Sequence, residues 1–180
     1  MKTMNQQTIS QYKSHGNGRF NPSDLKKMGN NVIFEDNVLI FHPGNVEIGN
    51  NVYIGHNSIL KGYHKNFLKI GDNCWIGQMC YMHSAGGITI GQAVGIGPGV
   101  KILTSVHKEN NLTNPIISND LEFDEVVIND DCDIGIGSII LPGVKIGQGS
   151  IVGAGSVVTK NIPKYSVYAG NPARLLRTRQ

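Results

Sequence analysis

Several patterns that mark common protein classes are missing from this sequence. No window holds about 18 uninterrupted apolar residues, and no charged stretch followed by an apolar one precedes a cleavage site, so we expect neither a membrane-spanning helix nor a secretory leader. The three cysteines lack the C-x-x-C spacing of a zinc pair. We therefore expect a cytoplasmic protein without a metal site.

Charge is also scarce, at 16% of residues with a net charge of +3. Much of the positive surplus lies near the end of the chain, at Lys160, Lys164, Arg174, Arg177 and Arg179. Nucleic-acid binding would call for a regular aromatic stacking platform among these residues, which the sequence does not offer. We expect instead a local anionic ligand, such as a cofactor phosphate.

What the sequence does contain is a six-residue period of apolar residues. The repeat occupies Met28, Phe34, Ile40; Ile48, Ile54, Leu60; Ile70, Ile76, Met82; Ile90, Ile96, Ile102; Ile128, Ile134, Ile140; Ile146, Val152 and Val158. Such a period is typical of a hexapeptide β-helix, in which three hexads make one triangular coil. We call these positions the register residues, and the three hexads of each coil its first, second and third faces.

The interruptions of the repeat all fall after the third face. Successive coils are separated there by 2, 4, 2, 20 and 0 extra residues. Because stacked coils superimpose like positions, we expect every insertion to emerge from one corner of the prism. The residue after the register position is mostly glycine on the first two faces, as at Gly49 and Gly135, and we interpret these glycines as suited to tight corners. The third face is irregular there, which is expected of a functional site.

The cysteines follow the same register. Cys74, Cys80 and Cys132 each lie four residues after a register position, where valine otherwise recurs. We expect buried, reduced thiols that pack as small hydrophobic residues.

The repeat gives way at both ends of the chain. We predict an N-terminal arm with a short helix over residues 1–27, with Ser23 or Asp24 as the N-cap. The β-helix is expected over 28–163, with a loop insertion at 108–124, and a C-terminal tail at 164–180 folding back over the final coils.

The run Ile134–Val144, the segment Gly153–Lys160 and the stretch Ala169–Arg174 resemble the hexapeptide acyltransferases, including galactoside and maltose O-acetyltransferases and sugar acetyltransferases of surface-polysaccharide pathways. The resemblance covers roughly residues 24–178. It implies an all-β fold, a left-handed parallel β-helix of about six coils with a short N-terminal helical segment and a C-terminal tail. It also implies an acyl-coenzyme A donor, an enzyme that is a homotrimer, and active sites between subunits.

The same resemblance implies a donor site at the end of the chain. The residues that match family positions contacting or flanking coenzyme A are Gly135, Ile136, Ala154, Thr159, Lys160, Arg174 and Arg177. An elongated thiol cofactor needs a straight groove, and its phosphates need fixed cations.

His107 is the predicted general base. It immediately precedes the long insertion, where family members place a catalytic histidine, and an imidazole titrates near the working pH. His83 and Ser84 lie one coil earlier, where relatives carry an aspartate or asparagine. Ser84 is a candidate donor to the acceptor or to a developing oxyanion, and His83 a candidate partner in acid–base chemistry.

Several histidines at the same corner suggest a zinc site as an alternative, because γ-class carbonic anhydrases bind zinc with three histidines on a left-handed β-helix. His42, His64, His83 and His107 lack the close histidine pair of that family, so we assign no metal.

The sequence therefore predicts an acyl-coenzyme A-dependent acyltransferase. Its leading acceptor is the amino group of a nucleotide-linked amino sugar, and a sugar hydroxyl, as in an O-acetyltransferase, is the alternative. A non-catalytic β-helix that binds ligands or serves as a scaffold is the second alternative. Acidic residues of the insertion, such as Glu122 and Asp124, are candidate contacts for an amine-bearing acceptor or simply solvated charges.

Overall fold

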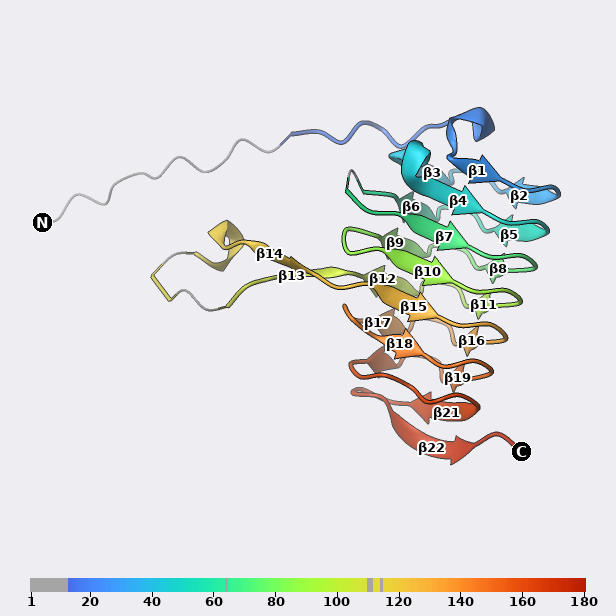
Figure 1. Ribbon diagram of the computed structural model, residues 1–180, viewed down its shortest axis with the longest axis vertical. Helices are drawn as coiled ribbons and strands as arrows, with labels where there is room; N and C mark the ends of the chain where they lie inside the picture. Colours follow the sequence, from blue (N-terminus) through green and yellow to red (C-terminus); the bar gives the residue numbers. More distant parts are fainter. Residues whose placement is uncertain (1–12, 64, 110–111, 114) are drawn as a thin grey trace, which may run out of the picture.

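The computed structural model describes residues 13–63, 65–109, 112–113 and 115–180. The N-terminal residues 1–12, His64 and the Asn110–Asn111 pair of the insertion lie outside the described residues. Within this range the regular structure consists mainly of short β-strands joined by turns, wound into a parallel prism with three faces (Figure 1).

Each predicted face is a sheet of stacked strands, which are parallel except at the last strand of the second sheet. The first contains β1 (Lys27–Met28), β4 (Val46–Ile48), β7 (Leu68–Ile70), β10 (Ile88–Ile90), β15 (Val126–Ile128) and β18 (Lys145–Ile146). The second contains β2 (Val32–Phe34), β5 (Val52–Ile54), β8 (Trp75–Ile76), β11 (Gly95–Ile96), β16 (Asp133–Ile134), β19 (Ile151–Val152), β21 (Ser166–Ala169) and β22 (Arg174–Thr178). The third contains β3 (Leu39–Phe41), β6 (Ile59–Lys61), β9 (Tyr81–His83), β12 (Lys101–Leu103), β17 (Ile139–Ile140) and β20 (Val157–Val158). The predicted parallel β-helix is confirmed.

The register residues form the core. Leu60 pairs with Met82 and Met82 with Ile102, so like positions superimpose along the third face. All register residues from Ile40 onward are buried, whereas Met28 is 42% exposed and Phe34 is partly buried. Both exceptions belong to the first coil, which has no coil above it. Phe34 there packs edge-to-face against Phe20, with ring centroids 5.1 Å apart.

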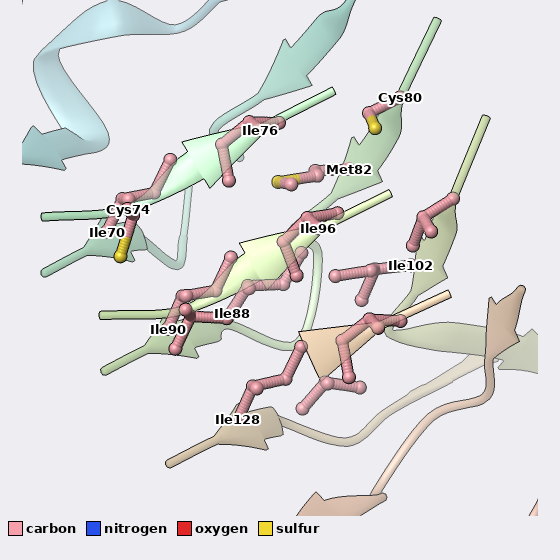
Figure 2. Packing of buried hydrophobic residues seen from close by; sticks show 14 of the residues in the cluster. Ile70, Cys74, Ile76, Cys80, Met82, Ile88, Ile90, Ile96, Ile102 and Ile128 are labelled. Carbon is pink, nitrogen blue, oxygen red and sulfur yellow. The ribbon is translucent and has the colours of Figure 1, made fainter. Parts of the chain in front are cut away.

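The cysteines lie where the register places them. Cys74, Cys80 and Cys132 are free and buried, and Figure 2 shows Cys74 and Cys80 among the isoleucines of the core. Burial raises the pKa of the Cys80 thiol to about 11. These thiols pack as small hydrophobic side chains, as predicted.

The recurrent glycines need a different explanation from the one we predicted. Those after the register residues do not have positive φ. At Gly135 a Cβ atom would approach the backbone nitrogen of Ala154 in the next coil to 2.5 Å, and at Gly77 that of Pro98 to 2.6 Å. The close approach of successive coils excludes a side chain there. Positive φ falls instead two residues later, as at Asn51 and Asn57.

All the insertions emerge from the corner between the third and first faces, as predicted. The first contains the 3-10 helix η2 (Pro43–Asn45). The longest forms an antiparallel hairpin of β13 (Ser105–His107) and β14 (Leu121–Phe123), with η3 (Ile116–Ser118) between them. The hairpin projects from the prism on the same side as the shorter turns (Figure 1).

The two ends of the chain complete the stack. A 3-10 helix, η1 (Pro22–Asp24), precedes the first coil, but its N-cap is Asn21 rather than Ser23 or Asp24. The Asn21 amide donates to the Asp24 carboxylate at 2.8 Å, which places Asp24 at the third helical position. At the other end β21 still pairs in parallel with β19, so winding continues past Pro163 before β22 folds back antiparallel to β21.

Candidate active site

Hydrogen bonds join the turns at the third-to-first corner into one structure. The Asn45 side-chain amide donates to the Tyr63 carbonyl at 2.6 Å, and the Asn66 amide donates to the Ala85 carbonyl one coil on. The Gly86 amide then donates to the Thr104 hydroxyl at 2.8 Å. The corner is therefore a continuous edge that leads from the first coils to the root of the hairpin.

His107 ends β13, the outgoing strand of the hairpin, opposite Leu121 of β14. Its Nδ1 lies 3.0 Å from the Asn119 carbonyl oxygen. A carbonyl oxygen only accepts, so this hydrogen bond requires the proton on Nδ1 and leaves the Nε2 lone pair available. The Asn119 side-chain amide also donates to the Lys108 carbonyl at 2.8 Å. This second bond holds Asn119 in place, so that its own carbonyl stays against His107.

A cavity of about 450 Å³ lies beside this histidine. Its lining consists of Val106, His107, Lys108, Glu109 and Glu122. The predicted base and a carboxylate of the insertion thus border the same space.

His83 ends β9 on the third face, where it lies between Lys61 of the preceding coil and Leu103 of the next. Its ring is parallel to that of Tyr81, with centroids 6.3 Å apart, and meets the Tyr63 ring edge-on at 5.6 Å. Burial, with the positive charges of Lys61 and His15, lowers the pKa of His83. The His83 imidazole thus lies among aromatic rings, and its charged form is disfavoured.

Ser84 does not have the geometry we predicted. It is fully buried, and its hydroxyl donates to the Lys61 carbonyl oxygen at 2.8 Å. That bond uses the only hydroxyl hydrogen, so Ser84 has none to donate to an acceptor or oxyanion. Its place in the tight turn after β9 fixes the path of the chain and exposes no reactive group.

The predicted donor residues fall into two groups. Gly135, Ile136 and Ala154 stack at the corner between the second and third faces, where Ile136 and Ala154 are exposed. Thr159 and Lys160 follow β20 at the opposite edge of the third face, and are exposed as well. Strand β20 separates the two groups, so a single straight groove on one subunit does not contain them all.

The two arginines lie on the last strand. Arg174 and Arg177 are exposed on β22, opposite Ala169 and Val167 of β21. Neither is paired with a carboxylate in the described part of the chain. Both cations are therefore available to a ligand at the C-terminal end of the stack.

No group of three or more His, Cys, Asp and Glu among the described residues is arranged to hold a metal ion. Likewise, none of the helices in residues 13–63, 65–109, 112–113 and 115–180 is long and apolar enough to cross a membrane.

The combination of a three-faced parallel β-helix and a hairpin carrying a histidine defines the class of hexapeptide-repeat transferases. Residues 125–160 match the family of bacterial transferase hexapeptides with six repeats, and residues 68–103 match the hexapeptide repeat of succinyl-transferase. A Saccharomyces cerevisiae protein named as an acetyltransferase is 33% identical over 92% of this chain and 78% of its own length. The chain belongs to the hexapeptide-repeat acyltransferase family.

Two similar proteins have more specific names. The galactoside O-acetyltransferase of Lactococcus lactis is 32% identical over 63% of this chain and 64% of its own. A variant of AntD, an N-acyltransferase from Bacillus cereus solved with dTDP-4-amino-4,6-dideoxyglucose and coenzyme A, superposes with a TM-score of 0.78. It is 26% identical and is aligned over 87% of this chain and 85% of its own. Matches to curated acetyltransferases of Schizosaccharomyces pombe and Mycobacterium tuberculosis span only 42% and 45% of those proteins.

Sequence reasoning missed several residues that shape the corner. Tyr63 contacts both His83 and Phe123 of the hairpin, with ring centroids 5.6 Å and 6.3 Å apart. Asn119, which orients His107, lies inside the insertion, where no repeat predicts its partner. Of these residues, only Thr104 had a signal in the sequence. It lies two residues after Ile102 and so continues the core-facing positions of β12, where a polar residue indicates a buried hydrogen bond.

Proposed function

We propose that this protein transfers an acetyl or other short acyl group from acyl-coenzyme A to the amino group of a nucleotide-linked amino sugar. The observation that carries the proposal is the orientation of His107 in a chain of this family. Its Nδ1 is held by the Asn119 carbonyl, and its Nε2 is left as a base on the projecting hairpin.

The reaction needs no covalent enzyme intermediate. The acceptor nitrogen attacks the thioester carbonyl carbon, and His107 Nε2 takes the proton that the nitrogen loses. The carbon–sulfur bond then breaks and the thiolate leaves, receiving a proton from the imidazolium to give free coenzyme A. The cysteines take no part, because all three are buried and protonated.

The donor contacts belong to this proposal too. Arg174, Arg177 and Lys160 provide cations for the donor phosphates, and Thr159 a hydroxyl beside them. Gly135, Ile136 and Ala154 form a second edge that suits the pantetheine arm, because its backbone groups lie close to the surface. Since β20 separates these groups, we assign the two edges to donor sites shared between neighbouring subunits.

A homotrimer with active sites between subunits follows from that assignment. Supporting it, the hairpin exposes large apolar side chains that the prism does not cover, among them Leu112, Ile116 and Ile117. Sedimentation equilibrium of the full chain tests the trimer, and a monomer at micromolar concentration would contradict it.

The choice of an amine rests on the likeness to AntD, an N-acyltransferase solved with a dTDP-linked 4-amino sugar and coenzyme A. A sugar hydroxyl is the second candidate, because a galactoside O-acetyltransferase is among the relatives. Release of coenzyme A thiol, corrected for hydrolysis, separates them when nucleotide amino sugars, free amino sugars and simple glycosides are compared. Turnover of glycosides alone would favour the hydroxyl.

A non-catalytic β-helix would neither release thiol nor need a donor. Calorimetry with acetyl-coenzyme A tests this alternative directly. If the protein does not bind acetyl-coenzyme A at millimolar concentration, the proposal that it is an acyltransferase is refuted.

A further inference from the structure

Lys61 lies on the third face and has no acidic partner among the residues that the structure describes. It occupies the outer position between Phe41 and His83, and its ammonium lies 5.8 Å from the centroid of the Phe41 ring. The carboxylates that form ion pairs in the described part of the chain are Glu47, Glu35 and Asp131, and none of them pairs with Lys61.

The rest of the outer surface of the third face offers no carboxylate either. Side chains alternate inward and outward along each strand, so the residues on both sides of a register position face out. These outward residues are Leu39, Phe41, Ile59, Lys61, Tyr81, His83, Lys101, Leu103, Ile139, Leu141, Val157 and Thr159. The face therefore has two lysines and a histidine, and no acid.

Lys61 is also partly withdrawn from water. Burial lowers the pKa of its ammonium group. A cation that loses hydration without gaining a carboxylate is in an unfavourable position, which an anionic ligand would relieve. His83 directly beside it presents an imidazole, which is able to donate a hydrogen bond.

Aromatic rings lie next to His83. Tyr81 is stacked on His83, and Tyr63 joins His83 to Phe123 of the hairpin. A ligand held here would meet a cation beside several aromatic rings. That combination suits a phosphate ester carried on a flat heterocycle.

We propose that Lys61 and His83 bind the phosphate oxygens of the nucleotide part of the acceptor. This inference rests on the proposed function, because it assumes a nucleotide-linked acceptor. Coenzyme A also carries phosphates, but the cations assigned to them, Lys160, Arg174 and Arg177, lie in the last coils. Lys61 lies in the second coil, far along the stack, so the acceptor is the source of the anion we assign to it (Figure 1).

Calorimetry on the full chain tests this assignment with dTDP and, separately, with coenzyme A. Lys61→Gln should weaken dTDP binding by about tenfold or more, since it removes a charge-assisted contact. Lys61→Arg keeps the charge and should retain most of the affinity. The matched control is Lys69→Gln, because the Lys69 ammonium also lies over a ring, that of Phe67 at 4.5 Å, but on the first face.

The two ligands distinguish the possible sources of the anion. Unchanged coenzyme A affinity in Lys61→Gln is expected, and a loss of coenzyme A affinity alone would overturn the assignment. So would wild-type dTDP affinity in Lys61→Gln, or no dTDP binding by the wild type. His83→Gln should also weaken dTDP binding. This second variant tests the same assignment if Lys61→Gln fails to fold.

Failure of the proposed function would look different. A wild-type protein that binds dTDP but neither binds coenzyme A nor releases thiol would refute acyl transfer and leave the phosphate site standing. A protein that acylates simple amino sugars but does not bind dTDP would refute the phosphate site and leave acyl transfer standing.

Discussion

The Thr104 hydroxyl donates a hydrogen bond to the His83 carbonyl oxygen at 2.6 Å. The same hydroxyl accepts from the Gly86 amide, and the Thr104 carbonyl accepts from the Asp124 amide where the chain returns from the hairpin. One buried side chain thereby ties the end of β9 to the root of the segment that carries His107.

Replacing Thr104 with valine keeps the shape and removes the hydroxyl. The His83 carbonyl and the Gly86 amide then lose a buried partner, so the free energy of unfolding should fall by about 1–3 kcal/mol. Urea denaturation measures this, with the exposed Thr178→Val as the control, expected to change by less than about 0.5 kcal/mol. Equal stabilities of the two variants would show that Thr104 is not a structural link.

Gly135→Ala should destabilise the stack, because the new Cβ would approach the Ala154 nitrogen to 2.5 Å. Overpacking of this kind costs about 1–3 kcal/mol. Gly44→Ala is the matched control, since its Cβ would meet nothing within 4 Å and its φ is not positive. Denaturation curves that shift equally for both would contradict the role assigned to close approach between coils.

Cys80 should contribute to the pH dependence of stability. Its folded-state pKa of about 11 lies above the value for an unfolded thiol, so the unfolded chain loses this proton first as the pH rises. The contribution is complete below the unfolded pKa and disappears as the pH approaches 11. Cys80→Val should flatten the alkaline fall in unfolding free energy, and an unchanged slope would refute the assignment.

His83 should titrate below the range of an ordinary histidine, mainly because it is buried and also because Lys61 and His15 are nearby. Lys61→Gln removes one positive charge and should raise the pKa of His83, without restoring it fully, because burial remains. A histidine NMR titration of both proteins measures the shift. A lower pKa in the variant would contradict the electrostatic account.

The fold was predictable because a solenoid repeats the same structural unit along the chain. Ile76 and Ile96 each occupy the same position in successive coils, so the period alone identifies the inward face, and the insertion lengths identify the corner. The glycines were predicted as corner residues for the wrong reason, because a sequence does not show how closely the backbones of Gly135 and Ala154 approach.

The site was less predictable because its contacts are not periodic. His107 was identified from its place before the insertion, but the residue that orients it, Asn119, is twelve positions later within that insertion. Ser84 was a candidate hydrogen-bond donor by its type and position, and only the structure shows that its hydroxyl donates to the Lys61 carbonyl oxygen. Burial and pairing of this kind depend on how coils and hairpin fold together.

The most direct test is the turnover of acetyl-coenzyme A with a dTDP-linked 4-amino sugar by wild type and His107→Ala, followed by mass spectrometry of the acylated product. Wild type should form the amide, and His107→Ala should lower kcat by about 10²–10⁴-fold through loss of the base. His56→Ala, at an exposed histidine paired with Glu35, should leave kcat unchanged. Retention of most activity in His107→Ala would contradict His107 as the base.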